Sequence, residues 1–270
     1  MKRHLLALLT LSSSFFGLTA FAADTSVLAP AVASQRSAEQ AEQVVGVGLG
    51  YGNHFFGGKT EWQAGLFGEA NFANGVFLST RDGLGYRFLN NNSGFSAAAS
   101  IGPSGWRKES YGKNDGTNRL KGMGDVELRA QANLFVNYDA GAFHVNTALH
   151  QTMGDRHDMS LDVVGRYDVL STKTDLVDVS AGLSYANKSD MGTYFGVTPA
   201  QSASSGNAVY TPKAGIAGYG IGATWRHEIT QNWVSTVSTG VTRLGSAASD
   251  SPLSDRRTSA GIGATIGYRF

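Results

Sequence analysis

Residues 125–138 read DVELRAQANLFVNY, and this stretch points directly to the fold class. Every second residue is apolar or small, and the positions between them carry polar or charged side chains, with Phe135 as the exception. Successive side chains of a β-strand point to opposite faces, so this alternation predicts a strand with one apolar and one polar face.

The same period of two returns along most of the chain. Apolar residues occupy alternate positions in residues 143–149, 161–169, 177–185 and 217–225, and again in the closing stretch 258–270. Many such strands in succession predict a β-sandwich or a β-barrel.

Strand length and aromatic placement favour a membrane barrel over a soluble sandwich. Several alternating runs reach the roughly 9 to 11 residues that cross a membrane as a tilted strand, whereas typical soluble strands have about five or six. Aromatic residues stand near predicted strand ends, as in the girdles of outer-membrane barrels: Tyr51, Trp62, Phe72, Phe88, Tyr138, Phe143, Tyr185, Trp225, Trp233, Tyr268 and Phe270. We therefore predict an all-β fold, a closed antiparallel transmembrane β-barrel.

The strand count follows from parity. Long polar connections are expected at residues 106–119, 188–212 and 245–257. In outer-membrane barrels the long loops lie on one side and the termini on the other. Four strands fit between the first two connections, two between the last two, and five before Trp106, where Asp82-Gly83 predicts a hairpin turn. The total is about twelve strands, with ten as the alternative if the region before Trp106 is divided differently.

Composition narrows the function classes. The 270 residues include 35 Gly and only 5 Pro, without a collagen-like period, so the glycine serves folded structure. The formal net charge is +1 and no basic run follows the first residues, so the chain lacks the electrostatic footprint of a nucleic-acid-binding protein. With no cysteine, the chain has no disulfide, thiolate metal site or cysteine nucleophile.

The first residues predict export. Lys2 and Arg3 precede an apolar run and the small-residue pattern Ala20-Phe21-Ala22, which predicts a signal peptide over residues 1–22. The alternative of a membrane anchor is disfavoured because the run is shorter than the roughly 20 residues of a spanning helix. Residues 23–43 form a predicted periplasmic lead-in, and residues 44–270 the barrel. The predicted location is the outer membrane of a Gram-negative cell.

Two patterns resemble ligand-binding motifs. The glycine spacings in residues 46–50 and 218–222 are not followed by the helical period that a dinucleotide fold needs, so we interpret them as small residues facing the lumen. Residues 155–158, Asp-Arg-His-Asp, lie near His144 and His150 in sequence, but the two histidines are roughly 20 Å apart along a strand and cannot share one ion. A polar hairpin in solvent is the favoured interpretation, and we predict no metal or cofactor site.

Enzymatic activity finds no support in the residue pattern. Ser202, Ser204 and Ser205 lack a nucleophile-elbow context, so we predict no catalytic residues. Charges of both signs are expected to face the lumen and to pair there, leaving at most a narrow path: Glu61, Glu69, Arg87, Glu127, Arg129, Asp162, Arg166, Asp178 and Arg226.

Several stretches resemble the MltA-interacting protein (MipA/OmpV) family of outer-membrane proteins. They are GYRFLNN at 85–91, RKES at 107–110, RLKGMGDV at 119–126, TYFGVTPAQ at 193–201, RL at 243–244 followed by DSP at 250–252, and GYRF at 267–270. The resemblance covers nearly all of the chain after the lead-in, and the 193–201 stretch is the most specific.

The resemblance implies a barrel without known catalytic residues. For some members it implies a scaffold that links a murein-degrading lytic transglycosylase to a murein-synthesising penicillin-binding protein, and for others a role in adhesion or in solute and drug uptake. We predict a non-enzymatic scaffold in cell-wall maintenance that contacts outer-membrane lipid and these two enzymes. The alternatives are a narrow small-solute or drug channel and a surface adhesin that uses the 188–212 loop.

Overall fold

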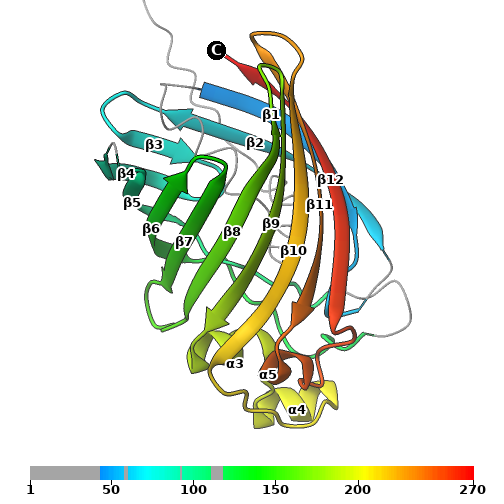
Figure 1. The fold of residues 1–270 in the computed structure, drawn as a ribbon. Helices are drawn as coiled ribbons and strands as arrows, with labels where there is room; N and C mark the ends of the chain where they lie inside the picture. The colour runs from blue at the N-terminus through cyan, green and yellow to red at the C-terminus, as the bar shows by residue number, and fades with distance from the viewer. Residues whose placement is uncertain (1–42, 58–59, 92, 111–117) are drawn as a thin grey trace, which may run out of the picture.

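A computed structural model describes residues 43–57, 60–91, 93–110 and 118–270. It is a closed barrel of twelve antiparallel strands, as predicted, and the alternative count of ten is wrong (Figure 1). The strands are β1 (Gln43–Gly52), β2 (Glu61–Asn71), β3 (Val76–Ser79), β4 (Gly83–Asn90), β5 (Phe95–Pro103), β6 (Ala130–Ala140), β7 (Phe143–Thr152), β8 (Met159–Ser171), β9 (Asp175–Ala186), β10 (Gly215–Glu228), β11 (Trp233–Leu244) and β12 (Thr258–Arg269). Between these strands the described residues form three helices, α3 (Lys188–Phe195), α4 (Pro199–Ser205) and α5 (Ser246–Ser249). The predicted signal peptide and residues 23–42 of the predicted lead-in lie outside the described residues. The last residue of the lead-in, Gln43, is the first residue of β1.

The barrel closes where its first and last strands meet. Tyr51 of β1 lies opposite Trp62 of β2 on one side and opposite Ile262 of β12 on the other. The Phe270 N–H donates to the Gln43 carbonyl at 3.0 Å, which brings the end of the chain beside the start of β1. Closure pairs β1 with a strand on each side, which satisfies its backbone groups as a membrane-spanning sheet requires. The ladder between β2 and β3 is short and joins only Glu69–Asn71 to Phe77–Ser79.

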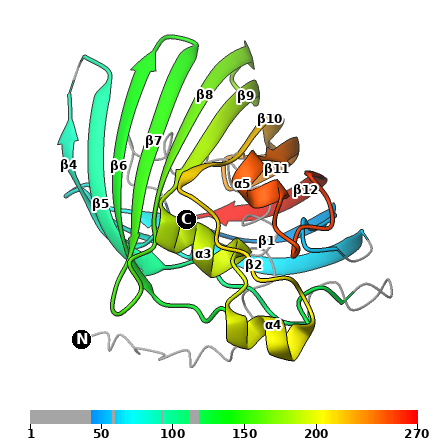
Figure 2. The ribbon, with the colours of Figure 1, turned by 90° about the horizontal axis from the view of Figure 1, so that it is seen from below.

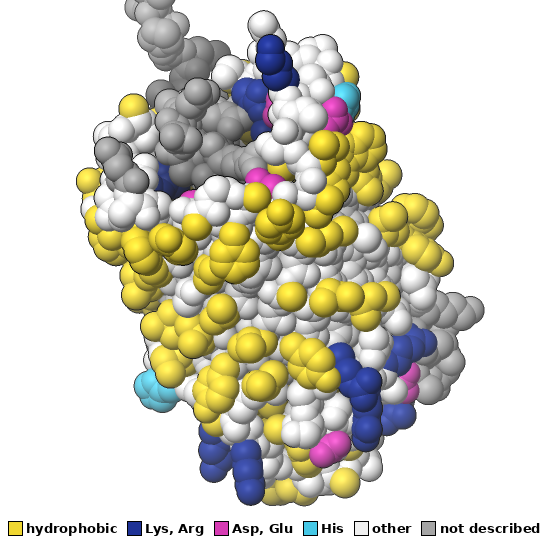
Figure 3. All heavy atoms as spheres, viewed as in Figure 1, with side chains coloured by type: hydrophobic (Ala, Val, Ile, Leu, Met, Phe, Trp, Pro, Cys, Tyr) yellow, Lys and Arg dark blue, Asp and Glu magenta, His cyan; other side chains and the backbone are white. Residues whose placement is uncertain are grey.

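The alternation predicted from sequence sets the two faces of the wall. Large apolar side chains point outward and are exposed, as at Trp62 (71%) and Ile221 (65%), and they form the band of hydrophobic surface in Figure 3. Polar residues of the same wall, such as Asn133 and Arg166, are buried inside. Phe135, the exception within residues 125–138, faces inward with its ring centroid 6.3 Å from that of His150.

Three register shifts interrupt the alternation, between Arg87 and Leu89, between Asp168 and Leu170, and between Ile216 and Gly218. The extra residue of a bulge moves the side chains that follow it to the opposite face. The prediction that Ala217 lies on the outer face is therefore wrong, because Ile216 is the exposed residue and Ala217 packs against a buried apolar cluster.

The strand predicted over residues 125–138 begins later than expected. β6 starts at Ala130, where pairing with β7 ends, and the preceding residues keep only isolated contacts with the chain that follows β5. Arg107 bridges Val126, and the Ser104 N–H donates to the Arg129 carbonyl at 2.7 Å. Leu128 consequently precedes the strand and is not a membrane-facing strand residue.

The two ends of the barrel differ in their connections. Turns of two to four residues, at 72–75, 91–94, 141–142, 172–174 and 229–232, join strands at the end that also holds Gln43 and Phe270, here called the turn end. The long connections predicted at 106–119, 188–212 and 245–257 all lie at the other end, the looped end, as do the shorter 53–60, 80–82 and 153–158. At 80–82 the predicted Asp82-Gly83 turn is confirmed, and Gly83 has φ 78°, which favours glycine. Outer-membrane barrels place long loops outside the cell, so in an outer membrane the looped end would be the outer one.

Among the described residues, no helix is both long and apolar enough to cross a membrane.

Candidate functional site

The connections at the looped end fold together into a cap, made of residues 53–57, 104–110, 118–129, 187–214 and 245–257. Viewed from this end in Figure 2, α3, α4 and α5 gather across the mouth of the barrel. Met191 of α3 and Ala248 of α5 are fully buried against Ala186 and Leu244, the last residues of β9 and β11. The helices are therefore anchored on the barrel rim itself.

Two apolar clusters stabilise the cap. The first consists of Phe55, Ala186, Met191, Leu244 and Ala248, and the second of Phe56, Leu120, Met123, Val197 and Leu253. Phe195, the last residue of α3, packs against both clusters and joins them. Burial of such side chains stabilises each by about 1.5 to 3 kcal/mol relative to exposure, so the cap has a core of its own.

Arg107 ties the β5–β6 connection to α3. Its side chain is buried, Nη1 donates to the Tyr194 carbonyl, and the guanidinium carbon lies 5.4 Å from the centre of the Phe56 ring. Burial lowers the pKa of this guanidinium to about 10, so the side chain is still cationic at neutral pH. The face of the Phe56 ring and the Tyr194 carbonyl together compensate the buried cation for the water that it has lost.

The most specific motif, residues 193–201, forms the centre of the cap. It runs from the last turn of α3 into α4, where Thr198 and Gln201 form a reciprocal capping box. The Gln201 side chain also donates to the Met123 carbonyl at 2.9 Å, and Ser251 donates to the Phe195 carbonyl at 2.6 Å. The stretches 107–110, 119–126, 193–201 and 250–252, far apart in the chain, therefore meet in one structure.

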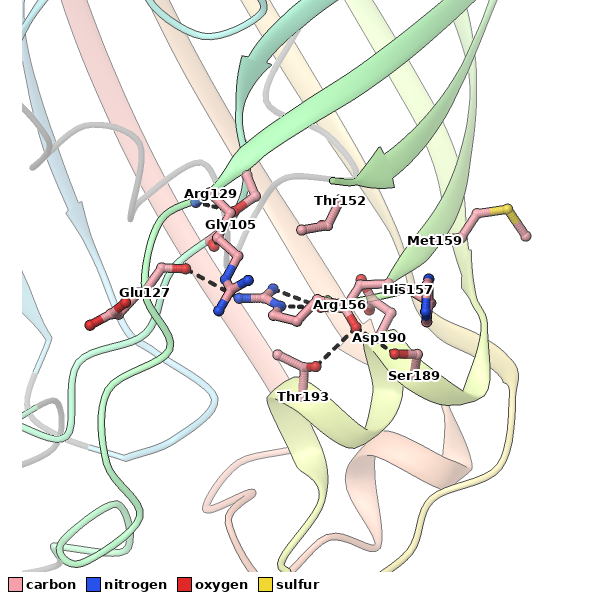
Figure 4. Close-up of polar contacts among 12 residues, drawn as sticks. Gly105, Glu127, Arg129, Thr152, Arg156, His157, Met159, Ser189, Asp190 and Thr193 are labelled. Carbon is pink, nitrogen blue, oxygen red and sulfur yellow. Dashed lines mark hydrogen bonds and ion pairs between the residues drawn. The ribbon is translucent and has the colours of Figure 1, made fainter. Parts of the chain in front are cut away.

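A buried carboxylate joins the cap to the β7–β8 turn (Figure 4). Asp158 is 2% exposed, and its Oδ2 accepts from Arg156 Nε at 2.7 Å. Its Oδ1 accepts from the hydroxyls of Ser189 at 2.7 Å and Thr193 at 3.0 Å, both on α3. Arg156 also donates to the Glu127 carbonyl at 3.2 Å, so three segments meet at this ion pair.

Two further groups on α3 have displaced pKa values. Burial, with the nearby charges of Asp158 and Asp162, raises the pKa of Asp190 to about 7. Burial also raises the pKa of Tyr194 to about 12, and this hydroxyl stays protonated at neutral pH. The Asp190 carboxyl consequently titrates near neutrality.

The turn at 155–158 thus differs from the solvent hairpin predicted from sequence. Asp155 is exposed and pairs with Arg129, but Asp158 is one of the most buried charged residues of the described chain. The sequence carried no signal of this difference, because the hydroxyl donors to Asp158 lie more than thirty residues away on α3.

Inside the barrel, the inward faces of β6, β7, β8 and β9 form a polar wall. His144 lies between two carboxylates, with Nδ1 2.5 Å from Asp139 Oδ1 and Nε2 3.3 Å from Asp168 Oδ2. His150 Nε2 lies 3.2 Å from Asp162 Oδ2. The polar wall is thus a network of paired groups, which low-dielectric interiors require.

The inward faces of β10, β11, β12 and β1 form a glycine wall. Gly222, Gly240, Gly261 and Gly52 are register partners across these four strands and contribute no side chain. In the strand order of the closed barrel, β12 and β1 lie opposite β6 and β7. The glycines at 46–50 and 218–222 are inward positions of this wall, as predicted from sequence.

The structure also places the other residues singled out in the sequence. His144 and His150 bind different carboxylates, and no group of three or more His, Asp or Glu suited to a metal occurs in the described parts of the chain. Ser204 and Ser205 lie on α4 and donate to the carbonyls of Gly122 and Gln201, each at 2.6 Å. Ser202, on the same helix, donates its backbone N–H to the Thr198 carbonyl.

The charges predicted to face the lumen divide into two groups. Glu61, Glu69, Arg87, Asp162, Arg166, Asp178 and Arg226 occupy inward positions of their strands. The prediction is wrong for Glu127 and Arg129, which precede β6 and belong to the cap. They were misplaced because the alternation of the sequence continues past the point where pairing with β7 ends.

Comparison with known proteins adds a family match. The family model described as MltA-interacting protein MipA matches residues 45–270. Outer membrane protein OmpV of Vibrio cholerae serotype O1 is 26% identical over 196 residues, which are 72% of this chain and 74% of that protein. Outer membrane protein Omp26La of Vibrio anguillarum is 25% identical over 190 residues, 70% of this chain and 71% of that one. Among solved structures, a KdgM porin aligns with 83% of this chain and 97% of its own at 11% identity and a TM-score of 0.42.

Proposed function

This chain belongs to the MltA-interacting protein MipA family, and from that membership we propose that it is a non-enzymatic outer-membrane scaffold. The partners we propose are a murein-degrading lytic transglycosylase and a murein-synthesising penicillin-binding protein. The scaffold would hold both enzymes at the inner face of the outer membrane, next to the cell wall.

The observation that carries this proposal is how the polar groups of the cap are used. Asp158 is surrounded by Arg156, Ser189 and Thr193, and the Ser204 hydroxyl bonds to a carbonyl. A nucleophile would need an adjacent base and a reachable substrate position. These hydroxyls and carboxylates instead satisfy each other within the cap, which favours a structural use over a catalytic one.

The turn end, at the opposite end of the barrel from the cap, supports the same proposal. Gln43 begins β1 there, beside Phe270, so the predicted lead-in joins the barrel at its inner end. The remaining contacts available at this end are turns of two to four residues. Partner enzymes in the periplasm would therefore meet the lead-in and these turns, with the membrane-embedded wall holding them in place.

Photocrosslinking in intact cells tests the scaffold. A photoreactive residue at Gln40 reports on partners of the lead-in, and a second at Lys173, in the exposed β8–β9 turn, reports on the turns. The outer control belongs at Ala203, which is exposed on α4. Capture of murein enzymes from Gln40 or Lys173 is expected. Capture of surface ligands from Ala203 alone would favour the adhesin alternative.

A narrow solute path is the second candidate, favoured by the contrast between the two walls. Polar and charged groups of β6–β9 face a wall whose inward positions at Gly222, Gly240 and Gly261 lack side chains. Small polar solutes would pass along the glycine wall, and polar pairs such as His144 with Asp139 would line their path. The cap limits this path at the outer mouth.

Conductance in planar bilayers tests the second candidate. We expect small steps from the unaltered chain and smaller ones from Gly222→Trp or Gly240→Trp, since an indole would project into the path. Ile221→Trp is the matched control, because Ile221 is 65% exposed on the lipid side of the same strand. Large, stable steps would favour an open porin instead, and equal conductance in all variants would exclude a path along the glycine wall.

A further inference from the structure

Four cations lie at the looped ends of four neighbouring strands. Lys188 follows β9, Lys213 precedes β10, Arg243 is near the end of β11, and Arg257 immediately precedes β12. All four residues are exposed. We call this set the basic rim, and Figure 3 shows Lys and Arg side chains gathered beyond the hydrophobic band at this end of the molecule.

Within the basic rim, Arg243 is on the outside of the barrel wall. Thr242 and Leu244 are buried, whereas Val241 is 43% exposed, so Arg243 shares the outward face of Val241. Its register partners are Tyr219 of β10, which is 48% exposed, and Thr258 of β12. Arg243 therefore continues a column of lipid-facing residues rather than pointing into the lumen.

Charge pairing within the chain leaves the basic rim largely uncompensated. Arg257 Nη2 lies 3.6 Å from Asp250 Oδ1, with side-chain exposures of 66% and 59%, and exposed pairs of this kind stabilise by under about 1 kcal/mol. No carboxylate of the described residues pairs with Lys188, Lys213 or Arg243. The rim thus presents net positive charge to its surroundings.

The hydrophobic surface next to the basic rim indicates how deep the rim lies in the membrane. Exposed apolar and aromatic residues stand next to it on the same strands: Tyr185 (45%), Ile216 (47%), Tyr219 (48%), Val241 (43%) and Ile262 (49%). Arg243 is two residues beyond Val241, which places it about 5 Å further along the membrane normal for a strand tilted by about 45°. Outward tyrosines mark the level where lipid tails give way to headgroups.

We propose that the basic rim binds the phosphate groups of a phosphorylated lipid in the outer leaflet, whose acyl chains lie against β9–β12. Guanidinium and ammonium groups are the side chains that recognise phosphate, by charge-assisted hydrogen bonds. Continuity with the hydrophobic band selects a lipid over a soluble anion, because one amphiphilic molecule contacts both surfaces at once. The lipid would hold the cap end at a set depth and orientation in the membrane.

Binding of diphosphorylated lipid A to the full chain in neutral detergent tests this proposal. Native mass spectrometry or titration would compare the unaltered chain with the triple variant Lys213→Gln, Arg243→Gln, Arg257→Gln. Each cation at a membrane surface contributes about fivefold in affinity, so the triple variant should bind about 100-fold more weakly. Lys173→Gln, an exposed cation at the turn end, is the matched control and should change binding less than about twofold.

Two probes separate phosphate-bearing lipid from other ligands. Dephosphorylated lipid A keeps the acyl chains and should bind the unaltered chain no better than the triple variant binds the phosphorylated lipid. Inorganic phosphate alone should not compete. Equal binding by the triple variant, equal binding of the dephosphorylated lipid, or full competition by inorganic phosphate would each overturn the proposal. Heat-modifiable migration verifies folding, and the three single variants replace the triple one if it fails to fold.

Discussion

The polar wall and the glycine wall adjoin at β9 and β10 and face each other across the lumen where β6 and β7 lie opposite β12 and β1, and they line the barrel interior differently. On β6–β9 the inward positions carry Asn133, His144, Arg166 and Asp178, all buried. On β10, β11, β12 and β1 many of the corresponding positions carry glycine or small residues, and the ion-paired Arg226, Glu228 and Arg269 lie near the turn end. The stability of the first wall depends on its charges finding partners, and that of the second on how much space lies in front of each glycine. Substitutions on the two sides should therefore fail for different reasons.

The largest effect is expected where the polar side continues into the cap. Asp158→Ala leaves the Arg156 guanidinium without its carboxylate in a buried site, which typically costs about 3 to 5 kcal/mol. The measurement is the free energy of opening of α3, from native-state hydrogen exchange of its amides. Asp155→Ala, three residues earlier, removes a carboxylate that is 78% exposed and should cost less than about 1 kcal/mol. Similar losses from both variants would contradict a buried role for Asp158.

The facing of the polar wall is tested by an arginine on either side of β6. Leu134 faces lipid and is 42% exposed, so Leu134→Arg should cost about 2 to 4 kcal/mol near the membrane midplane. Gln131 faces inward and bonds to Asn133, so Gln131→Arg should cost far less. Denaturant titration of folding into lipid vesicles measures both. Reversed costs would mean that the two faces are exchanged. Leu128, which the alternation alone would have selected, lies outside β6.

On the glycine wall, two alanine substitutions should differ although both glycines face inward. A Cβ on Gly46 would meet the Phe67 ring at 2.5 Å and the Ile266 carbonyl oxygen closer still, so Gly46→Ala forces the strands apart at a cost of about 1 to 3 kcal/mol. A Cβ on Gly263 meets its nearest atoms, Leu49 O and Ser238 Oγ, at 3.6 Å, an ordinary contact. Gly263→Ala should therefore be neutral or stabilise by up to about 1 kcal/mol. The same vesicle titration compares them, and equal losses would refute the steric argument.

A pH-dependent effect is confined to the cap. The pKa of Asp190 is raised to about 7 by burial and by Asp158 and Asp162, so the folded cap holds a proton that the unfolded segment releases at about 4. Between these values the folded state binds more protons, and its stability falls as pH rises from about 4 to about 7. Hydrogen exchange of α3 should be slower at pH 5 than at pH 8, after correction for intrinsic rates. Asp190→Asn should flatten this dependence, and an unchanged slope in that variant would assign the titration to another group.

The candidate site was predictable only in part. The stretches 107–110, 119–126 and 193–201 stand out in the sequence, but their convergence does not. The Arg107 side chain reaches the Tyr194 carbonyl 87 residues away, and Arg119 Nε donates to Asp255 Oδ1 136 residues away, at 3.0 Å. Contacts at such separations leave no periodic trace, because neither partner changes the alternation around the other.

The barrel itself could be derived from the order of the residues. A period of two, strand lengths that suit a bilayer, and long connections on one side of the strand count were enough to predict twelve antiparallel strands and the facing of most of them. These features are local, since each side chain is assigned to lipid or lumen by its position along its own strand.

Contacts between segments far apart in the chain decided two features of the structure. They set where the alternating strands end and how the long connections fold into the cap. The bulge at Ile216 turned Ala217 inward. Residues 126–129 pair with residues 104–107 beyond the end of β5, so the alternating stretch starts outside β6. Burial of Asp158 required contacts with α3, which is separated from the 155–158 turn along the chain by β8 and β9. Outside the bilayer, side chains no longer have to alternate between lipid and lumen. The structure of the cap therefore depends on which distant segments pack against one another.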